Sequence, residues 1–130
     1  MNVVLQERGW AGHFICANRC GFRRNTLVTL MNDAGVAQAR IVVSTVGLLR
    51  LSHNSEIEEV GLGRFFETMA FWSRKNDPRY HDVDVAREVS FDSPWAIGEV
   101  DADDRANDMH DAVVQEIAGK LMSGLLKEDC

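Results

Sequence analysis

Two long runs of strand-forming residues flank a short turn signal, and this pattern constrains the fold more than any other. Residues 22–31 read FRRNTLVTLM, and residues 36–51 read VAQARIVVSTVGLLRL. Between them stands NDAG, whose Asn, Asp and Gly adopt turn conformations that other residues resist. The pattern predicts a β-hairpin, and with it an antiparallel sheet.

Shorter segments extend this prediction. Residues 3–5 and 13–17 are short strand candidates, and residues 64–73 (RFFETMAFWS) carry apolar side chains on both faces, which favours a central strand. Residues 52–63 and 75–79 are predicted to be loops. Residues 83–91 alternate, which predicts a strand with one row of apolar side chains on a single face: Val83, Val85, Val89 and Phe91.

The last third of the chain changes to a helical pattern. Ser93-Pro94 predicts a helix start, and residues 105–126 carry an apolar stripe at helical spacing. The stripe consists of Met109, Val113, Ile117, Leu121 and Leu125. We therefore predict a single α+β domain over residues 1–130, an antiparallel sheet of about five strands packed against one long C-terminal helix.

Composition restricts the class of protein. With 20 acidic and 14 basic residues the formal net charge is −6, which disfavours non-specific nucleic-acid binding. No apolar run approaches the roughly 20 residues that span a bilayer, so no membrane partner is predicted. The first residues do not resemble a secretory leader, and the 3 cysteines do not suggest a disulfide framework. We expect a cytoplasmic location.

The segment HFICANRCGFRRNTL, residues 13–27, raises the question of a metal site. Zinc could use His13, Cys16 and Cys20 with His53 or His81, but the tight ligand pairs typical of zinc sites do not occur. A catalytic cysteine would need a setting that stabilises its thiolate. The simpler interpretation makes Cys16 a core residue and Cys20 a turn residue, so we predict no metal and no cofactor.

Arg23 and Arg24 follow in the same segment. Neighbouring residues of a strand point to opposite faces, so one arginine faces solvent and the other faces whatever packs on the sheet. A half-buried arginine needs a carboxylate, phosphate or carbonyl partner. The partner is either an internal carboxylate or an anionic ligand.

Two further charges interrupt apolar rows. Glu67 lies among apolar residues of one predicted strand, and Arg87 lies in the row of the next. A charge in an apolar row is costly unless it is paired, so Glu67 and Arg87 could pair with each other. The alternative is that they line a pocket, together with His13, Arg24 and His81.

Five runs of the sequence carry a resemblance to a known family: ERGWAGHFICANRCGFRRNTL, IVVSTVG, RFFETMAF, FDSPWAI and ANDMHDAVVQEI. Together they resemble a family of small proteins carried by phages, prophages and other mobile elements. The resemblance implies a mobile-element context and a single cytoplasmic domain. It implies no activity and no catalytic residues.

Two functions of different classes fit these observations. The first is a non-enzymatic binding protein that docks on a host protein or sequesters a small anionic ligand, with Arg23 or Arg24 donating to the anion. The alternative is a small hydrolase or transferase that acts on a nucleotide-like phosphorylated metabolite, with Glu67 or His81 as general base. Because no catalytic motif is present, the binding protein is the preferred hypothesis.

The apolar residues on both faces of residues 64–73 bear on assembly. We expect Phe66, Ala70 and Trp72 to need cover that a helix on the other face of the sheet cannot supply. This predicts a two-fold homodimer. The alternative is that residues 48–63 and Trp95 fold over that face within one chain.

Overall fold

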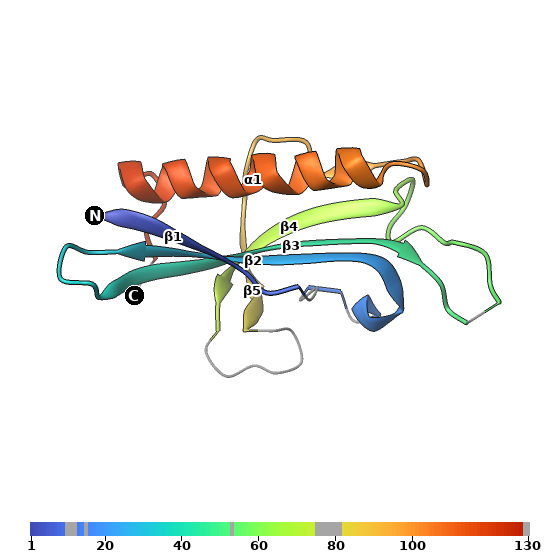
Figure 1. The fold of residues 1–130 in the computed structure, drawn as a ribbon, viewed down its shortest axis with the longest axis horizontal. Helices are drawn as coiled ribbons and strands as arrows, with labels where there is room; N and C mark the ends of the chain where they lie inside the picture. Colours follow the sequence, from blue (N-terminus) through green and yellow to red (C-terminus); the bar gives the residue numbers. More distant parts are fainter. Residues whose placement is uncertain (10–12, 15, 53, 75–81, 129–130) are drawn as a thin grey trace.

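The structure, a computed structural model, describes residues 1–9, 13–14, 16–52, 54–74 and 82–128. One antiparallel sheet carries a single long helix across one of its faces (Figure 1). The strands and helices have the following bounds: β1 Asn2–Glu7, the 3-10 helix η1 Ala17–Arg19, β2 Cys20–Met31, β3 Ala37–Leu49, β4 Phe66–Ser73, β5 Val83–Val89, β6 Ala96–Ile97 and α1 Asp103–Ser123. The predicted α+β class, with its sheet and long C-terminal helix, is confirmed.

The β2–β3 hairpin forms the centre of the sheet, as predicted. In its turn, the Asn32 side-chain oxygen accepts hydrogen bonds of 2.9 Å from the backbone N–H groups of Ala34 and Val36. Gly35 supplies the left-handed backbone conformation, with φ at +78°. Asn32 and Gly35 therefore stabilise the turn, Asn32 through its side-chain hydrogen bonds and Gly35 through its backbone conformation.

The sheet order is β1-β2-β3-β4-β5, and β6 pairs with β4 beside β5. Two of the smaller predictions are wrong. The described residues between 13 and 17 form no strand, and Ser93-Pro94 starts no helix, because the chain there leads into β6. Both were short segments, in which local pattern is easily overridden by tertiary packing.

α1 covers the sheet with its apolar stripe, except for Leu125, which follows the helix and is exposed. Asp103 and Asp104 occupy its first turn, where the helix dipole favours negative charge, and Gly124 ends it in a left-handed conformation with φ at +80°. The main core contains these buried residues: Val28, Leu30, Ala39, Ile41, Val43, Ala70, Val89, Val113, Val114, Ile117 and Leu121. Within the part of the chain that the structure describes, no helix combines the length and the apolar character needed to cross a membrane.

Glu116 ties the segment after β5 to α1. Its carboxylate accepts hydrogen bonds from the backbone N–H groups of Asp92 (2.7 Å) and Ser93 (2.8 Å). The Ser93 hydroxyl and the Lys120 ammonium also donate to it. Burial opposes ionisation of Glu116, but these hydrogen bonds outweigh burial and lower its pKa to about 2. Ser93 therefore anchors the linker to the middle of α1.

The pairing of β4 with β5 is irregular. Phe71 pairs with Glu88, yet Ser73 pairs with Val83, so two steps along β4 correspond to five steps along β5. The extra residues change which face the side chains of β5 occupy. Val83 packs with Phe71 on the face away from α1, whereas Val89 joins the core under α1. The prediction of a single apolar row from Val83 to Phe91 is therefore wrong.

The face that argued for a dimer lies under α1. Phe66 packs against Ala106 and Met109, and Ala70 and Trp72 join the core that α1 covers. The expectation that Phe66, Ala70 and Trp72 lack cover is wrong, because the helix lies on their face of the sheet. These residues therefore give no support to a homodimer.

Ile117→Asp should unfold the protein, because it places an unpaired carboxylate at a fully buried position between α1 and the sheet. We expect a loss of about 4 kcal/mol or more in the free energy of unfolding, measured by urea denaturation followed by circular dichroism. Gln115→Asp, at an exposed position of the same helix, is the matched control and should change little. A midpoint for Ile117→Asp equal to that of the control would contradict the packing of α1.

Candidate functional site

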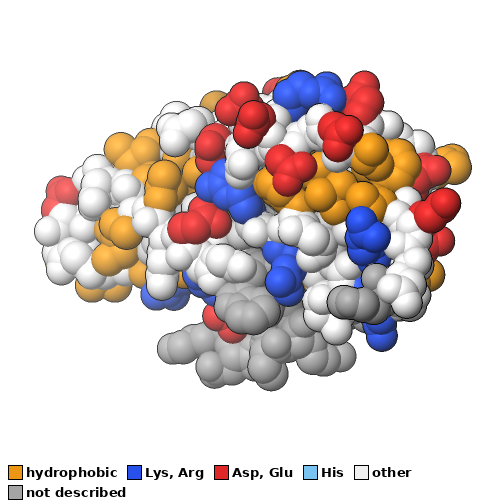
Figure 2. Space-filling view, turned by 45° about the vertical axis from the view of Figure 1, so that its right-hand side comes forward, with side chains coloured by type: hydrophobic (Ala, Val, Ile, Leu, Met, Phe, Trp, Pro, Cys, Tyr) orange, Lys and Arg blue, Asp and Glu red, His pale blue; other side chains and the backbone are white. Residues whose placement is uncertain are grey.

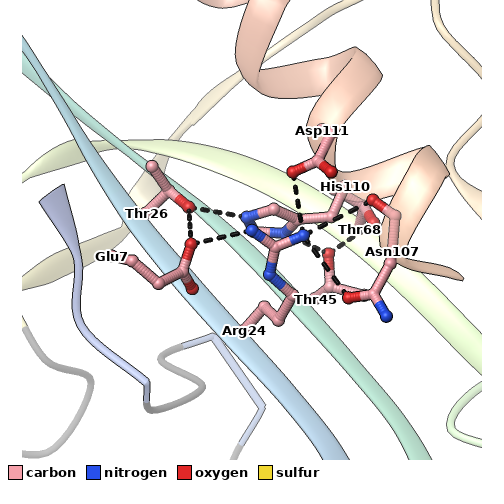
Figure 3. A network of polar contacts seen from close by, with 8 residues as sticks. All are labelled: Glu7, Arg24, Thr26, Thr45, Thr68, Asn107, His110 and Asp111. Atoms are coloured by element: carbon pink, nitrogen blue, oxygen red, sulfur yellow. Dashed lines mark hydrogen bonds and ion pairs between the residues drawn. The ribbon is translucent and has the colours of Figure 1, made fainter. Parts of the chain in front are cut away.

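Polar side chains gather on each face of the sheet. The group between the sheet and α1, here called the His110 network, consists of Glu7, Arg24, Thr26, Thr45, Thr68, Asn107, His110 and Asp111 (Figure 3). The group on the other face, here called the His13 cluster, consists of His13, Ser44, Arg64 and Glu67. Both contain residue types that can carry out chemistry, so both are candidate sites.

His110 projects from α1 into the sheet and is fully buried. Its Nε2 lies 2.7 Å from the Thr26 hydroxyl on β2, and its Nδ1 lies 2.6 Å from the Thr45 hydroxyl on β3. Thr45 in turn lies 2.7 Å from the Thr68 hydroxyl on β4. One ring therefore links the helix to three adjacent strands.

In this series of hydrogen bonds, the donor and the acceptor of each bond can be assigned. The Thr26 hydroxyl donates to the Glu7 carboxylate at 2.8 Å, and a hydroxyl has only one proton to donate. Thr26 must therefore accept from Nε2–H of His110, which leaves Nδ1 to accept from the Thr45 hydroxyl. Thr68 then donates to Thr45. The chain specifies a neutral His110 ring with its proton on Nε2.

Arg24 closes the network on its exposed side. It donates to Glu7 at 2.8 Å and to Asp111 at 2.8 Å, and it lies 3.4 Å from the side-chain oxygen of Asn107. Burial opposes ionisation of Glu7, but hydrogen bonds from Arg24 and Thr26 outweigh it and lower the pKa of Glu7. The half-buried Arg24 is thus paired internally with two carboxylates, one of the two outcomes expected from the sequence.

The electrostatics of the network keep His110 neutral. Burial in the helix–sheet interface lowers its pKa from 6.5 to about 4, and the positive charge of Arg24 acts in the same direction. The carboxylates of Glu7 and Asp111 oppose this effect without overcoming it. Since the ring stays neutral and has no exposed surface, it acts as a structural link and has no access to a ligand.

The His13 cluster lies on the face of the sheet away from α1. His13 Nδ1 lies 2.9 Å from the Ser44 hydroxyl, and Nε2 lies 3.0 Å from a Glu67 oxygen. The other Glu67 oxygen accepts from Arg64 Nε at 2.7 Å, and the Arg64 guanidinium lies 4.9 Å from the centre of the Trp95 ring. Burial raises the pKa of Glu67, but the hydrogen bonds from His13 and Arg64 outweigh burial and lower it.

A serine, a histidine and a carboxylate in series resemble the relay of a hydrolase. In a working relay the serine oxygen must reach the substrate, and the histidine must be able to pass a proton to it. Here Ser44 is fully buried, and the side chains of His13 and Glu67 are only 3% and 6% exposed. The arrangement holds the segment around His13 against β3 and β4, and it leaves the serine enclosed.

The structure brings together some of the predicted residues and separates others. His13 and Glu67 meet, with Arg64 as their arginine, whereas Arg24 lies under α1 on the other face. The pairing of Glu67 with Arg87 is wrong. Arg87 instead contacts Asp84 at 3.9 Å and Glu128 at 3.1 Å. The register places it near Trp72, whereas Glu67 lies earlier in β4, opposite Ala96 of β6.

The remaining predicted residues do not extend either group. Arg23 lies on the opposite face of β2 from Arg24, as alternation requires. His53 and His81 lie outside the described residues. The predicted pocket that joins His13, Arg24, His81 and Arg87 does not form from its described members, since Arg24 and His13 occupy opposite faces of the sheet.

Cys16 joins a small apolar cluster, as the simpler interpretation predicted. Cys20 is buried as the first residue of β2, and burial raises its pKa to about 11, so its thiol stays protonated. Both are free thiols, and among the described residues no group of His, Cys, Asp and Glu could hold a metal ion. His13 is also committed to Ser44 and Glu67.

Sequence reasoning missed His110 and Arg64. His110 lies three and seven residues before Val113 and Ile117, so a polar ring on the buried side of the predicted helix was the available signal. Comparisons with known proteins add no further guide: no family model matches this chain, and neither does any curated protein or solved structure.

The stability of the protein should depend on pH through His110. In the unfolded chain this histidine binds a proton as the pH falls through 6.5, whereas the folded form resists protonation down to about 4. Stability is therefore complete above the unfolded pKa and decreases as the pH falls from about 6.5 towards 4. Between pH 7 and pH 5 we expect His110 to account for a loss of about 2 kcal/mol.

His110→Gln isolates this contribution, because the glutamine side chain does not titrate. The free energy of unfolding of both proteins is measured by urea denaturation at pH 7 and pH 5. The carboxylates with lowered pKa, such as Glu7 and Glu67, lose their stabilising contribution only as the pH falls below their ordinary pKa of 4.5, and they are common to both proteins. Equal pH dependence in the two proteins would show that His110 is not held neutral.

Proposed function

We propose that this chain is a non-enzymatic binding protein that acts by docking on another protein. The observation that carries the proposal is an exposed leucine, Leu62, on a turn of fixed conformation. Its side chain is 97% exposed, more than any other large apolar side chain of the described residues. We expect an apolar side chain presented in this way to enter the apolar core of an interface with a partner.

The turn around Leu62 is held by hydrogen bonds. The backbone N–H of Val60 donates to the Arg64 carbonyl at 3.0 Å, and that of Arg64 donates to the Gly61 carbonyl at 3.1 Å. The N–H of Gly63 donates to the Glu59 carboxylate, and Gly63 adopts φ of +74°. Little backbone entropy is therefore lost at Leu62 on binding, which favours affinity.

The same loop forms an open cleft of about 510 Å³, lined by Leu49, Leu51, Ile57, Glu58, Glu59 and Phe65. Figure 2 turns this end of the molecule forward and shows a group of hydrophobic side chains at the surface, with Asp and Glu side chains mostly above it and Lys and Arg side chains mostly below it. With a net charge of −6, the protein should favour a partner whose surface is apolar and surrounded by basic side chains. The resemblance to mobile-element proteins makes a host protein the partner class that we propose.

A small anionic ligand fits the structure less well. Arg24 and Arg87 each lie near two carboxylates, and Arg64 is bound to Glu67. An anion would have to displace these carboxylates or bind beside them, and like charges close together are unfavourable. The small cleft that Arg64 lines also contains Glu88, so it has no excess of positive charge.

An enzyme acting on a phosphorylated metabolite fits less well for a second reason. Of the two predicted general bases, only Glu67 lies among the described residues. It is buried, and its carboxylate is bound to His13 and to Arg64. Its lowered pKa makes it a weak base. The polar atoms of the His13 cluster are thus bonded to one another and face the interior of the protein.

The proposal is tested by crosslinking the protein to its partner in host cells. Leu62→Ser should reduce recovery of the crosslinked partner by about tenfold or more, as expected when a central apolar contact is removed. Leu125→Ser is the matched control. Leu125 is also an exposed leucine, but it lies just after the C-terminal end of α1, away from the Leu62 turn. It should leave recovery unchanged, and both variants should melt as the unmodified protein does.

Two results would contradict the docking function. One is equal recovery with Leu62→Ser and with the control. The other is saturable binding of inorganic phosphate or a nucleotide by the unmodified protein, measured by calorimetry and abolished by Arg24→Met or Arg64→Met.

A further inference from the structure

The first strand leaves one edge of the sheet open. Within the described residues β1 pairs with β2 alone. The backbone N–H of Arg8 donates to the Asn25 carbonyl at 2.8 Å. In an antiparallel pair every second residue makes such hydrogen bonds, so the backbone groups of Arg8, Gln6, Val4 and Asn2 point towards β2. The N–H and C=O groups of Val3, Leu5 and Glu7 therefore point outward from the sheet.

The side chains along this edge are exposed on both faces. Val4 and Leu5 point to opposite faces of the sheet, and each is 45% exposed. A partner packed on one face could cover only one of them. A strand added to the edge would cover both and would also satisfy the outward backbone groups.

The two edges of the sheet differ in how they are protected. β5 carries Asp84, Arg87 and Glu88 and pairs irregularly with β4, features that oppose the addition of another strand. β1 has regular pairing and no charge or proline from Asn2 to Gln6. The contrast marks β1 as the edge that is suited to pairing.

We infer that β1 pairs antiparallel with β1 of a second copy of this chain, about a two-fold axis through Leu5. The outward residues Val3, Leu5 and Glu7 are placed symmetrically about Leu5, so this register matches every one of them and forms about six hydrogen bonds. It places Leu5 opposite Leu5, Val3 opposite Glu7, and Val4 opposite Gln6. No like charges face each other.

The charge at the end of the strand is already compensated. The Glu7 carboxylate accepts from Arg24 and from the Thr26 hydroxyl of its own chain, so pairing leaves no uncompensated charge at the seam. A two-fold axis normal to the sheet also places both α1 helices on the same face of one continuous sheet. The dimer expected from the sequence is thus assigned to β1, a different surface from Phe66, Ala70 and Trp72.

The test is the mass in solution, measured by light scattering at micromolar and higher concentrations. The unmodified protein should show twice its chain mass of 14.6 kDa. Leu5→Lys places like charges opposite each other at the axis and should raise the dissociation constant of the dimer by about tenfold or more. Val85→Lys, at an exposed apolar position on the β5 edge, makes the same change of charge and should leave the dimer intact.

Val4→Lys provides a second variant on the other face of the same strand. It should also dissociate the dimer, and it decides the matter if Leu5→Lys fails to fold. A monomer mass for the unmodified protein up to 100-fold above micromolar concentration would overturn the inference. So would a dimer that survives both β1 variants, since it would have to use another surface. Neither result bears on docking through Leu62, which lies in the loop between β3 and β4.

Discussion

The arrangement of this protein depends on one buried imidazole. His110 bridges Thr26 and Thr45, and the hydroxyl of Thr26 is committed to Glu7, so the direction of the whole chain of hydrogen bonds is fixed. A helix that packed only by apolar contact could slide along the sheet at modest cost, because such contacts have no direction. The His110 ring needs a hydrogen-bond acceptor on β2 and a donor on β3, so it allows α1 only one position along the sheet. The apolar core around Ile117 supplies most of the stabilisation, and His110 supplies the register.

The same inward pairing bears on the proposed function. The two polar groups found among the described residues hold parts of the fold together: the His110 network joins α1 to the sheet, and the His13 cluster joins the segment around His13 to β3 and β4. Their charged members are matched with opposite charges, which removes them as binding sites for small ions. Among the described residues, two apolar surface features carry the proposals made above: the Leu62 turn and the β1 edge. We propose that both contact other protein chains, and they lie apart, one on the loop between β3 and β4 and the other on the β1 edge.

The fold could be predicted from the sequence where the signal was local. Turn residues and β-branched runs specified the β2–β3 hairpin, and the apolar stripe specified α1, because in both cases the residues that decide lie close together in the chain. The site could be predicted only in part. His13 and Glu67, which were grouped together from the sequence, do meet in the structure. Arg24 finds Asp111 87 residues away, and no local pattern indicates such a partner. The expected pair of Glu67 and Arg87 failed because of register: Glu67 lies opposite Ala96 of β6, whereas Arg87 lies near Trp72, five residues further along β4.

The central claim is that His110 is a neutral, doubly hydrogen-bonded link between α1 and the sheet. The most direct measurement is a long-range nitrogen–proton correlation NMR spectrum of the histidine rings, recorded from pH 8 to pH 5. The hydrogen-bond chain predicts that the proton of His110 stays on Nε2 throughout this range, because the pKa of the ring is lowered to about 4. A proton on Nδ1, or a ring that titrates near its ordinary pKa of 6.5, would contradict it.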